Sequence, residues 1–291
     1  MNTQKDKKQI CFLVLLLILF AYTLFSLLYT LFIPLVGIHK WNEATCLTTI
    51  RQTFRLNDPF SFFARNDVSN PDYNTGYLFF WSSFIYFRLL NITGIKIDYF
   101  NFHIYGRVFS LIWTLASSLL LYEIMNLLLN EEDKGIISLV TVFAFLFSPL
   151  LLYFGTMYQP EPFCFMLFLL SIYLFLKYLR KRQYDKLIIS AGIFGAVVSD
   201  RKAFLIYAIS YIMMLFFLHS LPSRFLVRKK RSLLNFFLDL IKDKSYLIFT
   251  CVFGVSVISS VGILQIAVPE YNPFNFFSKR LLHPGKYLFS T

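Results

Sequence analysis

The stretch GAVVSDRKAFLIYA, Gly195–Ala208, places three consecutive charged residues between two apolar runs. As a helix, the apolar run before it, Leu187–Ser199, is only ~20 Å long, whereas the hydrocarbon core of a bilayer is ~30 Å thick. The run after it, Phe204–Leu221, is long enough to cross. We therefore expect a helical hairpin whose charged tip, Asp200–Lys202, lies below the membrane surface, where charge is costly unless it faces water or a partner. The simpler alternative is an ordinary loop whose basic side chains extend to the interface.

Composition also indicates a membrane protein. The 291 residues are 57% hydrophobic, with a mean hydropathy of +0.60, 36 Phe and 18 Tyr. A soluble domain of this length does not bury that much apolar surface. The net charge of +12 comes from cations at the ends of apolar runs, which argues against a nucleic-acid partner. The four cysteines show no metal-ligand or disulfide spacing.

Further apolar runs predict membrane-spanning helices on both sides of the hairpin. The first, Ile10–Val36, follows three lysines and has no small-residue cleavage site, so we interpret it as a retained span rather than a cleaved signal. The others are Tyr105–Leu129, Ile136–Phe154, Pro162–Leu179 and Tyr246–Val268.

Basic residues predict the orientation of these spans. Lysines and arginines gather in the N-terminus, in 177–186 and in 224–244, so all three segments are expected in the cytoplasm. The prediction is an all-α polytopic membrane protein of about seven spans, integral to a bacterial inner membrane or a eukaryotic endoplasmic reticulum. We treat 1–291 as one membrane domain, with a first span at 10–36, an outer loop at 37–104, six further spans within 105–268, and the start of another outer loop at 269–291.

The large outer loop is expected to carry two interfacial helices. In WNEATCLTTIRQTFR, 41–55, apolar residues recur at helical spacing, and Asn42 is a suitable N-cap. The aromatic stretch GYLFFWSSFIYFRLL, 76–90, suits a helix lying in the interface. A loop of this length is usually functional or carries its own structure.

Carboxylates and cations gather on the predicted outer side. A carboxylate that takes a proton from a hydroxyl, beside cations that hold a phosphate, suits group transfer from a lipid phosphate. Singly, each residue has a simpler explanation: Glu43 favours a helix dipole, and Arg107 anchors a span. The carboxylates are Glu43, Asp72 and Glu161, and the cations include Arg107, Arg201, Lys202 and Arg280.

The order of these features resembles the N-terminal half of the GT-C membrane glycosyltransferases, the group that contains protein O-mannosyltransferases and bacterial aminoarabinose transferases. WNEA matches the acidic start of the family's first loop helix, and NPDYNTGYLFFW matches the approach to the second. YGRVFSLIWTL has the arginine that opens the second span, MYQPEPF has the acidic residue beside proline, and VSDRKAF has the basic tip.

The resemblance implies transfer of a sugar from a polyprenyl-phosphate carrier to an acceptor on the outer or lumenal face, with inversion. It implies a catalytic carboxylate in the first loop, Glu43 or Asp72, and leaves the acceptor, a glycan, lipid or protein, unnamed. Some members use a divalent metal ion, and for this chain the metal stays open. The remaining implied roles are donor-phosphate binding by Arg201, Lys202, Arg107 and Arg280, and substrate or metal contact by Glu161 and Asn42.

Two departures from the family pattern keep alternatives open. Asn42 stands where the family has its leading Asp, and an amide cannot act as a base. Relatives continue with more spans beyond the position of Thr291, so we expect a piece of a longer protein or a chain with a protein partner. One alternative function is an inactive relative that binds lipid or assists assembly. Another is a transporter or flippase.

Overall fold

The computed structural model describes residues 2–32, 38–57, 77–98, 101–129, 134–148, 151–152, 155–200 and 244–267. This part of the chain is helical and holds no strand, which confirms the predicted all-α class. Its helices are α1 (Asn2–Phe32), α2 (Ile38–Leu56), α3 (Tyr77–Ile92), α4 (Phe102–Leu128), α5 (Lys134–Leu146), α7 (Pro160–Lys181), α8 (Tyr184–Asp200) and α11 (Lys244–Ala267).

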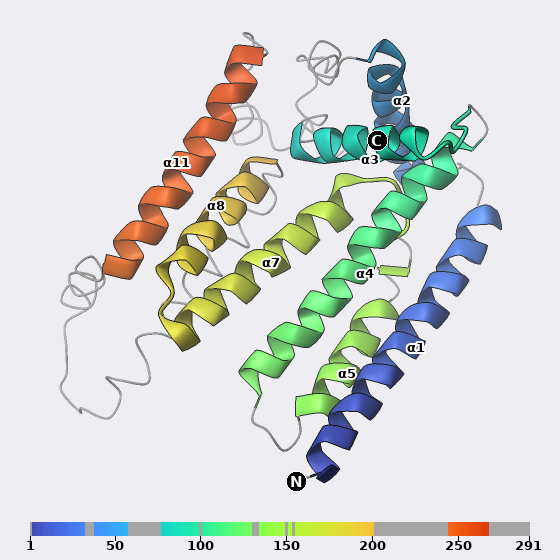
Figure 1. Ribbon diagram of the computed structural model, residues 1–291. Coiled ribbons are helices and arrows are strands. Elements are labelled where there is room, and N and C mark those ends of the chain that lie inside the picture. Colours follow the sequence, from blue (N-terminus) through green and yellow to red (C-terminus); the bar gives the residue numbers. More distant parts are fainter. Residues whose placement is uncertain are drawn as a thin grey trace, which may run out of the picture.

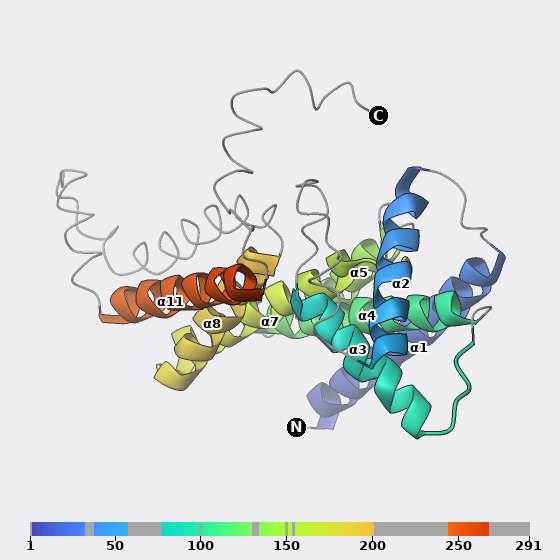
Figure 2. The same ribbon diagram turned by 90° about the horizontal axis from the view of Figure 1, so that it is seen from above.

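The long helices lie side by side as a tilted bundle, with α2 and α3 at one end (Figure 1). Helices α1, α5, α8 and α11 run toward that end, whereas α4 and α7 run away from it. Seen from above, α2 and α3 cross each other over the ends of the bundle (Figure 2). We call this the loop-helix end, because both helices come from the predicted outer loop.

Three of the described helices are long and apolar enough to cross a membrane, over Gln9–Thr30, Phe102–Leu128 and Pro160–Lys181. Shorter apolar helices lie at Leu78–Ile92, Lys134–Leu146 and Leu247–Ser259. The chain is therefore an integral membrane protein. The count of seven spans stays a prediction, since Phe204–Leu221 lies outside the described residues.

The predicted span Ile136–Phe154 is wrong at its C-terminal end, because α5 ends at Leu146. Pro149 follows closely, and proline both lacks an N–H group and disfavours a helical residue before it. Ser148 then accepts the backbone N–H of Leu151 on its hydroxyl, at 3.3 Å. The described chain continues with Leu151 and Leu152 and then with an irregular segment, 155–159, which is buried. This segment begins with a helix-type bond from the Gly155 N–H to the Leu151 carbonyl, at 2.7 Å.

The short helix predicted from the opening stretch is confirmed as α8, which has 17 residues. At 1.5 Å per residue it is about 26 Å long, still shorter than a ~30 Å hydrocarbon core. Small and hydroxylated residues let its neighbours approach closely, as is common where helices pack in membranes. Ser171 on α7 and Ser190 on α8 each donate to the other's carbonyl, at 2.9 and 2.8 Å. On the other side, the Ser256 hydroxyl of α11 donates to the Gly192 carbonyl at 2.8 Å.

Candidate active site

An aromatic core fixes the two loop helices on the bundle. Phe79, Phe80 and Phe87 of α3 have at most 1% of their surface exposed. The Phe79 ring lies 5.0 Å from Tyr158 and 6.0 Å from Phe109 of α4, measured between ring centroids. Aromatic side chains bury large apolar areas and prefer such tilted and edge-to-face contacts. This packing sets the depth at which the polar groups of α2 meet α4.

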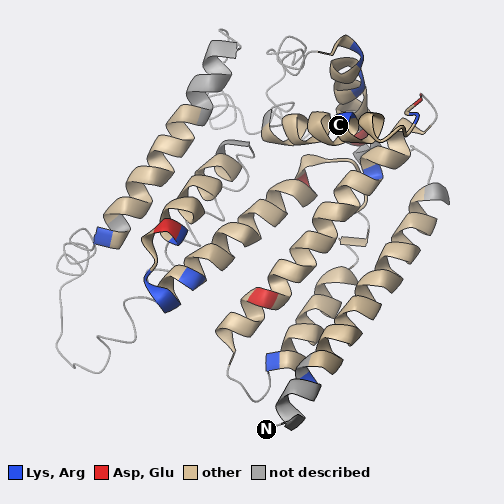
Figure 3. Cartoon of the chain, in the orientation of Figure 1, with Lys and Arg blue, Asp and Glu red and all other residues tan. Residues whose placement is uncertain are grey.

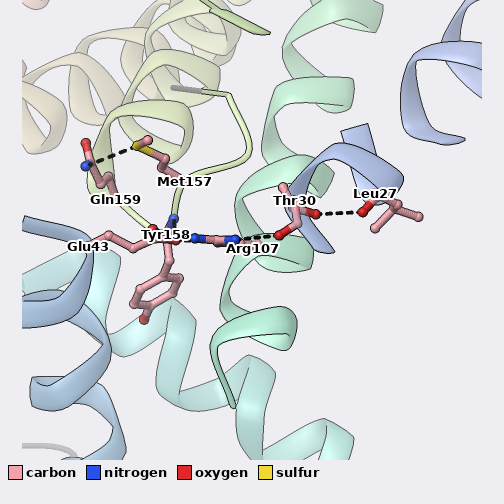
Figure 4. Close-up of polar contacts among 7 residues, drawn as sticks. All are labelled: Leu27, Thr30, Glu43, Arg107, Met157, Tyr158 and Gln159. Atoms are coloured by element: carbon pink, nitrogen blue, oxygen red, sulfur yellow. Dashed lines mark hydrogen bonds and ion pairs between the residues drawn. The ribbon is translucent and has the colours of Figure 1, made fainter. Parts of the chain in front are cut away.

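A buried ion pair joins α2 to α4 (Figure 4). Arg107 donates from Nε to Oε1 of Glu43 at 2.8 Å, and from a terminal nitrogen to Oε2 at 2.9 Å. Glu43 is fully buried and the Arg107 residue is 4% exposed. Two parallel bonds between a guanidinium and a carboxylate fix the direction as well as the distance of the pair.

Two backbone groups complete this pair. The other terminal nitrogen of Arg107 donates to the Thr30 carbonyl at 2.7 Å, in the last turn of α1, where carbonyls have no helical partner. The Tyr158 N–H donates to Oε1 of Glu43 at 3.1 Å. In Figure 4, Arg107 lies between Glu43 and Thr30, with Tyr158 beside the carboxylate. The Glu43–Arg107 pair thus fastens α1, α2, α4 and the segment before α7 to one another.

The pair limits what Glu43 does chemically in this arrangement. Both carboxylate oxygens accept hydrogen bonds, and none of the Glu43 surface is exposed. A general base must come within hydrogen-bond reach of the hydroxyl that loses its proton. Glu43 meets that condition only if the junction opens. The same bonds engage Arg107, for which the family resemblance implies contact with the donor phosphate.

Tyr158 packs at the centre of the junction. A Cβ added to Gly106 would lie 3.0 Å from the Tyr158 ring and 2.7 Å from Leu47, so the glycine of the YGR motif allows a close approach. Burial raises the pKa of the Tyr158 phenol well above 10.0. The nearby Ser83 hydroxyl opposes this effect only in part, and the two hydroxyls do not form a hydrogen bond of ordinary geometry. Burial likewise raises the pKa of Tyr86 on α3 to about 12. Both phenols are therefore neutral at physiological pH.

Several buried polar atoms near this core have no hydrogen-bond partner in the described part of the chain. Such orphaned groups are uncommon in folded proteins. Ser110 and Trp113 share one face of α4 with Gly106, three or four residues apart. The atoms are the hydroxyls of Ser83, Ser110 and Tyr158 and the indole nitrogen of Trp113.

Two other predicted site residues lie at the same end of the bundle. Glu161 is exposed in the first turn of α7, where a negative charge favours the helix dipole. Asn42 lies inside α2 rather than at its N-cap, because the helix begins at Ile38, directly after Gly37. The predicted capping role of Asn42 is therefore wrong. As a helical neighbour of Glu43, it lies about 100° around the axis from it.

Four predicted site residues lie outside the described part of the chain: Asp72, Arg201, Lys202 and Arg280. Within the described residues, no group of three or more histidine, cysteine or acidic side chains is placed to hold a metal ion.

Two backbone groups of the site, the Thr30 carbonyl and the Tyr158 N–H, were not predicted from the sequence, because backbone groups carry no residue-type signal. Only the glycine before Arg107 hinted at close packing there.

Helices of membrane-spanning length, with α2 fastened to one end by a buried ion pair and α3 packed there through aromatic side chains, define an integral membrane protein with a polar candidate site at that end. The chain belongs to the dolichyl-phosphate-mannose-protein mannosyltransferase family, whose model matches residues 95–242, just over half of the 291 residues. The resemblance to membrane glycosyltransferases is thereby confirmed. Searches of curated proteins and of solved structures found no match.

The matched range covers part of the candidate site. It begins just before α4 and runs past α8, so it includes Arg107, Tyr158 and Glu161 together with Arg201 and Lys202. Glu43, Asp72 and Arg280 lie outside it. The ion pair therefore connects a matched residue to one in the preceding loop.

Proposed function

We propose that the chain transfers a sugar from a polyprenyl-phosphate carrier to an acceptor hydroxyl at the loop-helix end. The observation that carries the proposal is the Glu43–Arg107 pair, with its bonds of 2.8 and 2.9 Å. It fastens the first-loop helix α2 onto α4, inside the range that matches a family of membrane mannosyltransferases. Polar groups of the outer loop and of the helix bundle are thereby held together at the end where we propose that the polyprenyl-phosphate sugar binds.

The chemistry proposed is a single displacement with inversion. The acceptor oxygen attacks the anomeric carbon of the sugar, and the bond from that carbon to the phosphate oxygen breaks. The hydroxyl proton passes to a carboxylate, and the lipid phosphate leaves with the bonding electrons. Charge develops on the leaving phosphate, so cations placed there stabilise the transition state.

Because Glu43 is buried, we propose that different carboxylates position the site and accept the proton. We assign Glu43 to positioning, because its two oxygens already hold Arg107 and the Tyr158 N–H. The proton acceptor is then Asp72 in the same loop, or Glu161, which is exposed on the first turn of α7. Glu43 takes the proton itself only in a state where the pair has separated.

The cations divide in the same way. Arg107 supports the site by satisfying Glu43 and the end of α1, rather than by binding phosphate directly. Arg201 and Lys202, which follow α8, and Arg280 in the later loop are proposed to hold the donor phosphate. The short α8 supports this assignment, since residues just past its end begin below the level that a full span reaches.

The orientation proposed places the N-terminus in the cytoplasm and the loop-helix end on the outer or lumenal face. Basic residues at the opposite end of the bundle support it (Figure 3), since loops rich in lysine and arginine stay on the cytoplasmic side. The membrane is an inner membrane in a bacterium and the endoplasmic reticulum in a eukaryote.

The test follows transfer from a labelled donor. Membranes that contain the full chain receive polyprenyl-phosphate-mannose labelled in the sugar, and the release of label to acceptors is measured. Loss of a group that stabilises developing charge typically lowers the rate ~100-fold or more, so Lys202→Ala should nearly abolish transfer. The matched control is Lys7→Ala, at the start of α1 and the opposite end of the bundle. Equal rates in wild type and Lys202→Ala would remove Lys202 from the site.

A second candidate is a non-catalytic relative that binds the lipid donor. Two observations favour it: Asn42 stands beside Glu43 in place of an acid, and the neighbouring carboxylate is sealed in an ion pair. In the same experiment this relative retains labelled donor on the purified protein without forming product. Transport differs from both, because label then crosses a sealed vesicle while still attached to its carrier.

A further inference from the structure

The end of the bundle opposite the loop helices is rich in cations (Figure 3). Here α7 ends, and α8 and α11 begin. Arg180, Lys181 and Arg182 are exposed, as is Lys244 at the start of α11. None of these residues has a role in the proposed transfer, which takes place at the other end.

A tight turn between α7 and α8 organises these charges. Arg182 adopts the left-handed conformation, with φ of 54°, and its N–H donates to the Tyr178 carbonyl at 2.7 Å. This bond ends α7 and lets α8 begin two residues later, at Tyr184. The turn brings the rings of Tyr178 and Tyr184 to 5.7 Å between centroids. The two rings make an aromatic platform where the helices join.

A cation lies over each ring of this platform. The guanidinium of Arg182 is 5.8 Å from the centre of the Tyr178 ring, and the ammonium of Lys244 is 5.8 Å from that of Tyr184. Separations near 6 Å still allow attraction between a cation and the ring face. Tyr178 also bonds to the Ser245 hydroxyl, which holds α11 against the turn. We call Tyr178, Arg182, Tyr184 and Lys244 the cation–tyrosine cluster.

The charge balance around the cluster is positive among the described residues. The acid beside it, Asp185, pairs with its neighbour Lys186 at 3.1 Å, and the Lys186 side chain lowers the pKa of that carboxyl. Arg180 donates to the Leu127 carbonyl at the end of α4, so its charge is also held near this surface. Tyr184 remains 43% exposed. Anionic groups approaching from the membrane therefore meet cations and an exposed aromatic edge.

We propose that the cation–tyrosine cluster binds the phosphate headgroup of an anionic phospholipid. Arg182 and Lys244 lie at the level where α7 ends and α11 begins, and tyrosine rings favour the boundary between headgroups and acyl chains. Basic residues at this depth attract anionic lipids. The lipid joins α11 to the α7–α8 pair from the outside, at the end where Tyr178 bonds to Ser245.

The test uses the purified full chain in a neutral detergent. Phosphatidylglycerol or phosphatidylcholine is added in increasing amounts, and the unfolding temperature is recorded at each ratio. The unfolding temperature of the wild type should increase to a plateau with phosphatidylglycerol and should not increase with phosphatidylcholine. Each cation near an anionic surface contributes about fivefold in affinity. The double variant Arg182→Gln/Lys244→Gln should therefore need about 25-fold more phosphatidylglycerol to reach half of the maximal increase in unfolding temperature.

The control variant is Lys7→Gln/Lys134→Gln, which removes the same charge from the starts of α1 and α5 at the same end of the bundle. It should respond to phosphatidylglycerol like the wild type. Equal weakening in both double variants would mean general attraction of anionic lipid, and the cluster would not be a site. A rise produced equally by inorganic phosphate would also overturn a lipid site. If the paired change prevents folding, Lys244→Gln alone should show the fivefold effect.

Discussion

Arg107 serves two partners of different kinds with one side chain. It neutralises Glu43 through two parallel bonds and satisfies a carbonyl at the end of α1. Removing either charge leaves the other buried without its counter-charge, which is costly in a site that excludes water. The geometry also explains why lysine is not an adequate replacement, since an ammonium cannot reproduce the planar fork of a guanidinium.

At the residue scale, we predict that Glu43→Gln destabilises the fold by about 3 kcal/mol, the usual cost of breaking a buried pair. Chemical or thermal unfolding in detergent measures the effect. The double variant Glu43→Gln/Arg107→Gln should lose less than the sum of its single variants, because no buried charge is left unpaired. Independent, additive losses would show that the two side chains do not depend on each other.

At the scale of elements, α8 is held between two neighbours by small residues. Ser190 of α8 exchanges hydrogen bonds with Ser171 of α7. On the α11 side, the Gly192 carbonyl accepts the Ser256 hydroxyl, and Gly195 lies directly against Ser256. A Cβ on Gly195 would lie 2.7 Å from the Ser256 Cβ and 2.9 Å from the Phe253 carbonyl oxygen. These contacts are too short for real atoms, so the backbones approach closely only because Gly195 has no side chain.

We therefore predict opposite effects from the same substitution at two positions on α8. Gly195→Ala should lower the unfolding temperature, because α11 must move away. Gly192→Ala has no atom within 4 Å of the added Cβ and should be neutral, or stabilising by up to ~1 kcal/mol from the better helix propensity of alanine. Unfolding of the two purified variants is compared side by side. Similar losses at both positions would contradict the close packing at Gly195.

At the scale of the whole molecule, the polar groups discussed above lie in two sets, one at each end of the bundle. The loop-helix end holds the buried pair, the orphaned hydroxyls and Glu161, and the opposite end holds the cation–tyrosine cluster. Helices of membrane-spanning length separate the two ends. The proposed transfer site and the proposed lipid site therefore share no residues.

The topology leads to a labelling prediction. Arg55 on α2 and Lys181 on α7 are exposed at opposite ends. Single cysteines at these positions, in a chain with its own cysteines replaced by serine, are treated with a maleimide that does not cross membranes. Sealed cells should label Arg55→Cys only, and inverted vesicles should label Lys181→Cys only. Labelling of both from one side would exclude a bundle that spans the membrane between them.

Much of the architecture follows from sequence because its signals are local. Apolar runs and their lengths predicted α4, α7, α8 and α11 to within a few residues, and aromatic patterning predicted α3. The errors also have local causes: Pro149 follows the early end of α5, and the four residues between Gly37 and Asn42 include none that stops a helix. Helix boundaries depend on such single residues more than on the average composition of a stretch.

The candidate site was predictable as a set of residues and not as an arrangement. Glu43 and Arg107 were both selected from the sequence, as a base and as a phosphate ligand, yet they bind each other. Hydropathy and helical spacing report on neighbours a few positions apart, whereas these two residues are separated by 64 positions. The cation–tyrosine cluster was not foreseen as a unit, because Lys244 reaches Tyr184 across helices far apart in the chain.

By itself, the sequence determined the membrane class, the helical content and which residue types are available at each helix end, because apolar length and charge placement act within one segment. Only the tertiary structure decided which carboxylate meets which cation, where backbones approach without a side chain, and which charges share an aromatic platform. Those outcomes depend on how separate helices pack, and packing is governed by the shapes of surfaces that neighbouring residues in the chain do not encode.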